Sequence, residues 1–221
     1  SGELSKNKQL NFSPYIYPDD NVENILDKIF SANVKTLHDT AEKIDRQALK
    51  KAIEQIKKAD KIYIYGVGTS AIFVNEFQYR LMQLGYNVLA FTDVASMKIS
   101  TLNLKKGDVA IGISHSGRAV ATVEAMRLAK ENGALLFGIC NVVGSSIARM
   151  TGAGCYTHVG PEIGVASTKA FTAQVQILIM LALSLAKEKN TIDNDFYHHV
   201  LEEMFTLPKK IESILAQNDK I

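Results

Sequence analysis

The chain has 221 residues, of which 47% are hydrophobic and 22% are charged, a balance that excludes disordered and collagen-like classes. Its 25 Lys and Arg residues against 23 Asp and Glu leave a net charge of +2, with the basic residues scattered along the chain. Because a nucleic-acid binder gathers positive charge on one face, we expect no direct nucleic-acid contact.

The cysteines and the apolar stretches predict the cellular location. Cys140 and Cys155 stand in apolar surroundings without CxxC spacing, which indicates buried thiols in a reducing compartment and hence a cytoplasmic protein. The longest apolar stretch, 175–186, is interrupted by Gln176 and Ser184, so we predict no membrane span. No His, Asp and Glu cluster has metal-ligand spacing, and neither a metal nor another cofactor is predicted.

The N-terminal part predicts an irregular lead-in followed by helices. Residues 1–20 contain two prolines and many polar residues, which is typical of irregular structure. Apolar residues then recur at helical spacing, which predicts helices over about 20–43 and 45–59. The chain opens on Ser1 and Gly2 without Met, which indicates a tag remnant or a processed start and leaves open that it is a piece of a longer protein.

The middle of the chain alternates short apolar runs with longer amphipathic segments. The predicted strands cover 61–65, 87–91, 108–113, 134–139 and 154–157. Their hydrophobicity is continuous, which is typical of strands buried on both faces of a parallel sheet. With helices between them, the predicted fold is α/β, a three-layer αβα sandwich around a five-stranded parallel sheet.

The C-terminal third predicts two more helices. One covers about 168–187 and the other about 193–207, where Pro208 is expected to end it. We therefore predict one domain over 21–190 and a helical extension or connector over 191–221.

Loops rich in Gly, Ser and Thr follow four of the five predicted strands. They are Gly66-Val-Gly-Thr-Ser70, Ser114-His-Ser-Gly117, Asn141-Val-Val-Gly-Ser-Ser146 and the segment from Gly160 to Lys169. Ligands of open α/β sheets bind beyond the carboxyl ends of the strands, where these loops must lie. Backbone amides, hydroxyls and helix N-termini are neutral donors suited to an anion, and a phosphate matches them best.

Helix capping is the alternative use of such hydroxyls. Capping needs one side chain per helix, whereas Thr69, Ser70, Ser114 and Ser116 supply four for two helices, which favours a ligand site. His115 either pairs with the phosphate as an imidazolium or contributes only its backbone.

A dinucleotide site is a second alternative. Gly66-x-Gly68-x-x-Ala71 fits the permissive Rossmann fingerprint, and Asp93 stands where a ribose-binding acid belongs. An NAD-binding oxidoreductase would leave the Ser-x-Ser-Gly loop without a task, so we rank it lower.

The loops resemble the sugar isomerase (SIS) family of phosphosugar-binding domains over about 61–187. The strings at 139–149 and 161–172 are similar to the isomerase domain of glutamine:fructose-6-phosphate aminotransferases (glucosamine-6-phosphate synthases). Residues 15–118, and Gly112-Ile-Ser-His-Ser-Gly-Arg118 above all, are more similar to the sugar-phosphate-sensing domain of RpiR-type transcription regulators. A hybrid of the two branches is therefore a further alternative.

In both branches the resemblance implies a site for the phosphate of a sugar phosphate such as fructose 6-phosphate or an amino-sugar 6-phosphate. The expected substrate-binding residues are Gly68, Thr69, Ser70, Ser114, His115, Ser116, Gly117, Thr122, Val165, Ala166, Ser167 and Lys169. Members usually carry Thr two residues after the Ser-x-Ser-Gly glycine. Here Ala119 stands there, and Thr122, one helical turn on, is the expected replacement.

Isomerase chemistry requires a carboxylate that moves a proton between C1 and C2 of the sugar. Glu162 is the candidate, and the alternative is that it only complements a helix dipole. In the aminotransferase branch the resemblance places proton transfer in a second SIS half, and residues 194–215 are similar to the connector leading to it. Binding without turnover, as in a sensor, therefore stays open beside aldose–ketose isomerisation. The apolar helices at both ends predict a homodimer.

Overall fold

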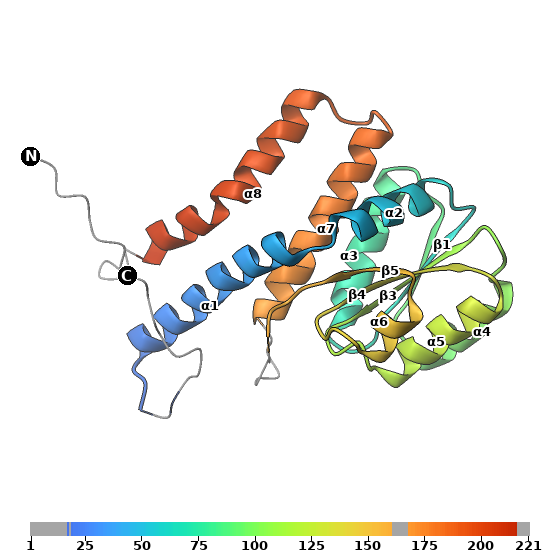
Figure 1. Ribbon diagram of the computed structural model, residues 1–221, viewed down its shortest axis with the longest axis horizontal. Coiled ribbons are helices and arrows are strands. Elements are labelled where there is room, and N and C mark those ends of the chain that lie inside the picture. The colour runs from blue at the N-terminus through green and yellow to red at the C-terminus, as the bar shows by residue number, and fades with distance from the viewer. Residues whose placement is uncertain (1–16, 18, 161–167, 216–221) are drawn as a thin grey trace, which may run out of the picture.

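The computed structural model describes residues 17, 19–160 and 168–215. Its strands are β1 (Ile62–Tyr65), β2 (Val88–Phe91), β3 (Val109–Ser114), β4 (Leu135–Cys140) and β5 (Ala153–Tyr156). All pairings between them are parallel, and the strand order is β2-β1-β3-β4-β5 (Figure 1). The predicted five-stranded parallel sheet is confirmed.

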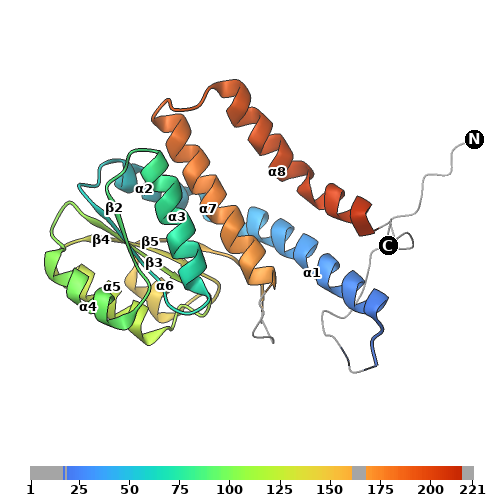
Figure 2. The same cartoon turned by 180° about the vertical axis from the view of Figure 1, so that it is seen from behind.

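Helices cover both faces of this sheet. They are α1 (Val22–Lys43), α2 (Arg46–Lys57), α3 (Ser70–Gln83), α4 (Val94–Ser100), α5 (Val120–Glu131), α6 (Ser146–Met150), α7 (Thr168–Glu188) and α8 (Asn194–Leu215), with a 3-10 turn, η1, at Thr101–Asn103. Helices α2, α3 and α7 lie on one side of the sheet, and α4, α5 and α6 lie on the other (Figures 1 and 2). The three-layer αβα sandwich is therefore also confirmed.

Strand β1 shows why the apolar runs are continuous. Ile62 and Ile64 are buried in the core beneath α2, α3 and α7, whereas Tyr63 and Tyr65 are buried in the second core, beneath α4 and α5. Successive side chains point to opposite faces of a strand, so a strand covered on both sides must be apolar at every position.

Helix α7 is the most apolar helix of the described chain. By length and composition alone, its residues 169–188 are the one described segment that would cross a membrane. Ile177, Leu181 and Leu185 are fully buried, and α7 contacts α1, α2 and α3. These contacts make α7 a core helix of an α/β domain.

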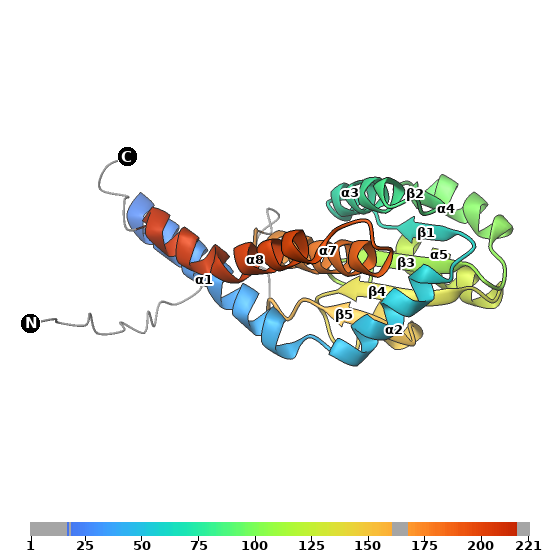
Figure 3. The same cartoon turned by 90° about the horizontal axis from the view of Figure 1, so that it is seen from above.

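Helices α1 and α8 project beyond the sheet. They pack on each other and on α7, and Figure 3 shows them side by side away from the strands. The expectation that α8 ends before Pro208 is wrong, because the helix continues to Leu215 with the proline inside it. Proline removes one backbone N–H, and the packing of α8 against α1 offsets that loss.

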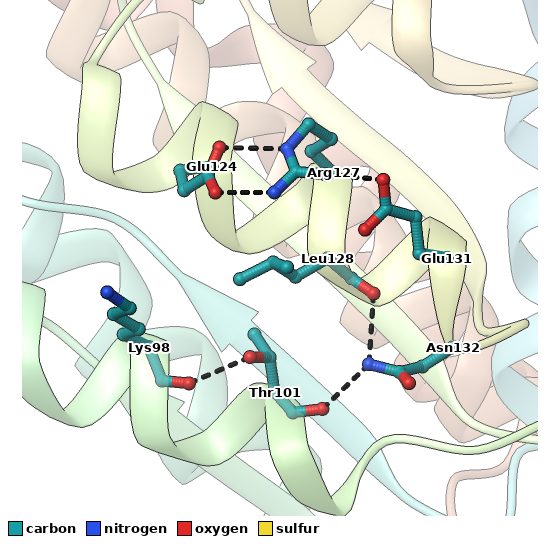
Figure 4. Close-up of polar contacts among 7 residues, drawn as sticks. All are labelled: Lys98, Thr101, Glu124, Arg127, Leu128, Glu131 and Asn132. Carbon is teal, nitrogen blue, oxygen red and sulfur yellow. Dashed lines mark hydrogen bonds and ion pairs between the residues drawn. The ribbon is translucent and has the colours of Figure 1, made fainter.

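The far end of α5 is held at the amino edge of the sheet. There the Asn132 Nδ2 donates to the carbonyl oxygens of Leu128, at 3.1 Å, and Thr101, at 3.0 Å, which ties α5 to η1 (Figure 4). One turn earlier Arg127 pairs with Glu124 and Glu131 on the surface of α5. This cluster lies at the opposite edge of the sheet from the loops with predicted ligand contacts.

Candidate functional site

The strand order brings the loops after β1 and β3 together. From β1 the chain crosses to β2 on one side, whereas β3, β4 and β5 follow on the other, so a topological switch point lies between β1 and β3. A Cβ on Gly66 would lie 2.8 Å from the Ile113 carbonyl oxygen and 2.7 Å from the Val74 Cγ2. The glycine therefore permits the loop after β1 to lie directly against the end of β3.

The loop after β3 holds two serine hydroxyls in different surroundings. Ser114 is buried, and its Oγ accepts the Gly117 N–H at 3.2 Å. Ser116 is exposed, and its Oγ accepts the Arg118 N–H at 3.2 Å. Since each oxygen accepts from the backbone, each hydroxyl hydrogen stays available to a ligand oxygen.

Gly117 fixes this loop on the start of α6. Its φ is +62°, in the left-handed region, and an added Cβ would lie 2.1 Å from the Ser145 Oγ. The Gly117 carbonyl accepts the Ile147 N–H at 3.0 Å. Only glycine satisfies both the backbone conformation and the close approach.

The loop after β1 is more open. Gly68 also has a φ of +62°, but nothing lies within 4 Å of where its Cβ would be. Thr69 is exposed and Ser70 is buried at the first position of α3. The N–H groups of Ser70 and Ala71 donate to the carbonyls of Val67 and Gly68. The Thr69 hydroxyl is therefore the exposed donor of this loop.

The helices differ in how their N-termini are capped. Side-chain oxygens accept from the first turn of five described helices, and these caps are Asn21 on α1, Asp45 on α2, Asp93 on α4, Ser145 on α6 and Asp193 on α8. The N-cap residues of α3 and α5, Thr69 and Ala119, make no side-chain cap. The hydroxyl after β1 and the first amides of α5 are thus left for another acceptor, as an anion site requires.

The other predicted site residues are placed less uniformly. His115 is half-buried next to Ser114, and Lys169 is half-buried in the first turn of α7. Thr122 is fully buried on α5, the helix after the loop Ser114–Gly117 that we call the serine loop, and its Oγ1 has no hydrogen-bond partner among the described residues. Glu162, Val165, Ala166 and Ser167 lie outside the described residues.

Asp93 has a different role from the one a dinucleotide site would give it. Its carboxylate accepts the Ser96 N–H at 2.9 Å and the Ser96 hydroxyl. These bonds lower the pKa of Asp93 below its ordinary value, because they favour the charged form. In this structure Asp93, the residue that a dinucleotide site would use to bind ribose, caps α4 instead.

Asn141, at the start of the loop after β4, connects two other loops. Its N–H donates to the His115 carbonyl at 2.9 Å, and its side chain bonds to Thr157, Val159 and Gly160 in the loop after β5. The sequence places Asn141 in a polar loop and assigns it no contact. An amide residue directly after a buried strand was the available signal.

The two cysteines are buried and free, which confirms the prediction of buried thiols. Burial raises the pKa of the Cys155 thiol to about 12, so the thiol is neutral and unreactive. Within residues 17, 19–160 and 168–215, no three His, Cys, Asp or Glu side chains are grouped to hold a metal.

The structure defines an α/β domain whose loops after β1 and β3, rich in hydroxyl and amide donors, meet at the switch point of its sheet. The SIS domain family model matches residues 55–184, and the chain belongs to this family.

Curated relatives share this part of the chain. Glutamine–fructose-6-phosphate aminotransferase (isomerizing) from Bacteroides thetaiotaomicron is 55% identical over 114 residues, which cover 52% of this chain and 19% of that protein. The protein of the same name from Chlorobaculum tepidum is 45% identical over 172 residues, covering 76% of this chain and 27% of that protein. The chain thus spans less than a third of either relative.

Solved structures share the fold. The C-terminal domain of glucosamine-fructose-6-phosphate aminotransferase from Francisella tularensis matches with a TM-score of 0.72 at 26% identity, covering 88% of this chain and 56% of that one. The sugar isomerase domain of an RpiR transcription factor from Sphaerobacter thermophilus matches with a TM-score of 0.67 at 20% identity, covering 88% and 97%. Both branches of the predicted resemblance therefore have structural neighbours.

Proposed function

We propose that this SIS domain binds a phosphorylated sugar of the fructose 6-phosphate or amino-sugar 6-phosphate type. The binding domain extends over residues 21–190, with a lead-in before it and a helical connector over 191–221. The phosphate lies between the loops after β1 and β3 and accepts hydrogen bonds from hydroxyls and amides of Gly68–Ser70 and Ser114–Gly117.

The contrast in capping carries this proposal. Among the α-helices whose N-cap the structure describes, the two without a side-chain cap are the two that follow β1 and β3, on either side of the switch point. A phosphate has about two negative charges and three acceptor oxygens near neutral pH, so it can take the place of the missing caps. Thr69 and Ser116, both exposed, supply hydroxyl hydrogens.

The sugar class comes from the relatives. The aminotransferases that match this chain act on fructose 6-phosphate according to their names, and this chain is 45% identical to one of them over 172 residues. Isothermal titration with fructose 6-phosphate, glucosamine 6-phosphate and N-acetylated amino-sugar phosphates tests the proposal. We expect heat with at least one of them and none with NAD. Binding of NAD alone would refute the proposal.

Sugar-phosphate sensing is the second candidate function. This chain covers 97% of the sugar isomerase domain of an RpiR transcription factor, so its fold spans the whole of such a domain. Incubation with fructose 6-phosphate, followed by NMR detection of glucose 6-phosphate, separates the two functions. Product formation supports an isomerase, in which Glu162 is the proposed base, and binding without product supports a sensor.

We also propose a cytoplasmic homodimer. The two buried, free cysteines support a reducing compartment. An apolar cleft of about 980 Å³ between α3, α7 and α8 supports self-association, because Ile72, Phe171 and Phe196 line it and are exposed. Light scattering that finds only particles of 24.3 kDa would exclude the dimer.

A further inference from the structure

Asn141 is the point where the loops after β3, β4 and β5 are joined. The residue is 8% exposed and follows the last residue of β4. Its backbone N–H donates to the His115 carbonyl at 2.9 Å, which attaches it to the serine loop. Its side chain bonds to the loop after β5, so a single residue connects the proposed phosphate site to the neighbouring part of the rim. The rim is the edge of the sheet formed by the loops that follow its strands.

The side-chain amide of Asn141 is fixed in one orientation by three hydrogen bonds. Its Oδ1 accepts the Val159 N–H at 2.8 Å and the Thr157 hydroxyl at 3.2 Å, and its Nδ2 donates to the Gly160 carbonyl at 2.8 Å. A flipped amide would direct its NH₂ group at the Val159 N–H and its oxygen at the Gly160 carbonyl, which opposes donors to donors and acceptors to acceptors. The network therefore specifies an asparagine at this position.

The loop that Asn141 holds has an unusual backbone. His158 has a φ of +48° and Gly160 a φ of +72°, so two left-handed residues flank Val159. A left-handed non-glycine residue costs free energy and persists only where the surroundings hold it. The holding contacts are the Asn141 amide and the Thr40 hydroxyl, which donates to the Thr157 carbonyl from α1. This loop is thus built to keep one shape.

The place of this loop indicates what it serves. The proposed phosphate site lies between β1 and β3, and the rim continues from β3 through β4 to β5. On the opposite side, toward β2, the Asp93 carboxylate is engaged by the Ser96 N–H and hydroxyl at the start of α4, so it serves the cap and not the sugar hydroxyls. A sugar attached to the phosphate is therefore expected to extend toward β4 and β5, past Asn141.

We propose that Asn141 is a positioning residue that sets the affinity for the sugar part of the ligand by holding the Thr157–Gly160 loop in register with the serine loop. This inference rests on the proposed phosphosugar binding. It predicts that loss of the Asn141 amide weakens binding of a sugar phosphate but not of inorganic phosphate, which the loops after β1 and β3 hold by themselves.

Titration calorimetry of the full chain with fructose 6-phosphate and with inorganic phosphate tests this. For Asn141→Leu, which keeps the size of the side chain and removes its polar atoms, we expect about tenfold weaker binding of fructose 6-phosphate and an affinity for inorganic phosphate within about twofold of the wild type. Asn132→Leu is the matched control, since it removes an amide with two carbonyl acceptors at the opposite edge of the sheet. It is expected to lower the melting temperature without changing either affinity.

A second pair of variants covers the case in which Asn141→Leu does not fold. Thr157→Val removes the hydroxyl that donates to the Asn141 Oδ1, and we expect about threefold weaker fructose 6-phosphate binding. Thr157→Ser keeps that hydroxyl and should restore the affinity. Equal losses for both ligands, or no loss for either, would overturn the role of Asn141. A wild-type protein that binds neither ligand would instead overturn the proposed function.

Discussion

The rim between β1 and β3 differs from the rest of the rim in how its helices begin. Helices α4 and α6 start on Asp93 and Ser145, whose side chains accept from the first turn, whereas α3 and α5 start on Thr69 and Ala119 without such a bond. Capping stabilises a helix by about 1 kcal/mol, so the two helices that follow the adjacent strands β1 and β3 both forgo this stabilisation. The first turns of α4 and α6 are satisfied by side chains of the fold itself, whereas under our proposal those of α3 and α5 are satisfied by the ligand.

The largest effect should come from closing the space beneath the serine loop. Gly117→Ala puts a Cβ where the Ser145 Oγ lies and retains a left-handed φ, so we expect a loss of about 3 kcal/mol in unfolding free energy. That corresponds to a melting temperature lower by about 10 °C. Gly68→Ala is the control, because it has the same φ with open space around it and should lose only about 1 kcal/mol. Equal losses in thermal melts would show that loop packing on α6 is unimportant.

Removing the Thr69 hydroxyl separates a ligand contact from a cap. Thr69→Ala should weaken phosphosugar binding about tenfold, because a hydrogen bond to a charged group is lost, and leave the melting temperature within about 1 °C. Asp45→Ala, at the capped start of α2, should lower the melting temperature by about 3 °C and leave affinity unchanged. Calorimetry and thermal melts on both variants measure the contrast. Loss of stability without loss of affinity in Thr69→Ala would contradict it.

Adding a side-chain cap to α5 should raise the stability of the protein and weaken phosphosugar binding. Ala119→Asp adds a carboxylate that accepts from the first turn of α5, so we expect about 1 kcal/mol of added stability. The same carboxylate competes with the phosphate for those amides and repels it, so phosphosugar binding should weaken at least about tenfold. Ala119→Asn, which caps without charge, tells competition from repulsion. Unchanged affinity in both variants would exclude the first turn of α5 from the site.

The smallest expected effect is a pH dependence at the loop after β5. Burial, with help from the positive charge of Lys43, lowers the pKa of His158 below its ordinary 6.5, although Asp39 acts in the opposite direction. The unfolded chain therefore binds the proton more readily, and the stability that neutral His158 contributes is complete above pH 6.5 and declines as the pH falls below it. Asparagine tolerates the positive φ, so His158→Asn should fold. Between pH 7.5 and 5.5 its melting temperature should fall slightly less than that of the wild type. An identical drop in both proteins would argue against this role.

The sequence alone located the sheet and most of the helices. Strands such as 61–65 and 108–113 were predicted within a residue or two of β1 and β3, because burial on both faces makes every position apolar. The position of Pro208 misled the prediction of α8, since the local cost of proline was outweighed by packing on α1 that lies far away in the sequence.

For the candidate site, the sequence predicted which polar residues lie in the loops but not which hydrogen bonds they make. Thr69 and Ser145 are both hydroxyl residues at helix starts, yet Ser145 caps its helix and Thr69 does not. Asp93 fits a ribose-binding position by spacing and caps α4 in the structure. Thr122 is fully buried on α5, which its spacing after the serine loop did not show, and its contact with a ligand stays a prediction. Hydrogen-bond partners depend on backbone geometry within an ångström, which spacing along a chain does not specify.

The amino-acid sequence determined the α/β class, the parallel strands and the glycine- and serine-rich turns after them, because local propensity and hydrophobic period act between near neighbours. Only the tertiary structure decided that the turns after β1 and β3 adjoin and that Asn141 joins the serine loop to Gly160. Strand order and the contacts between loops depend on residues far apart in the chain, and those contacts form only when the whole sheet is assembled.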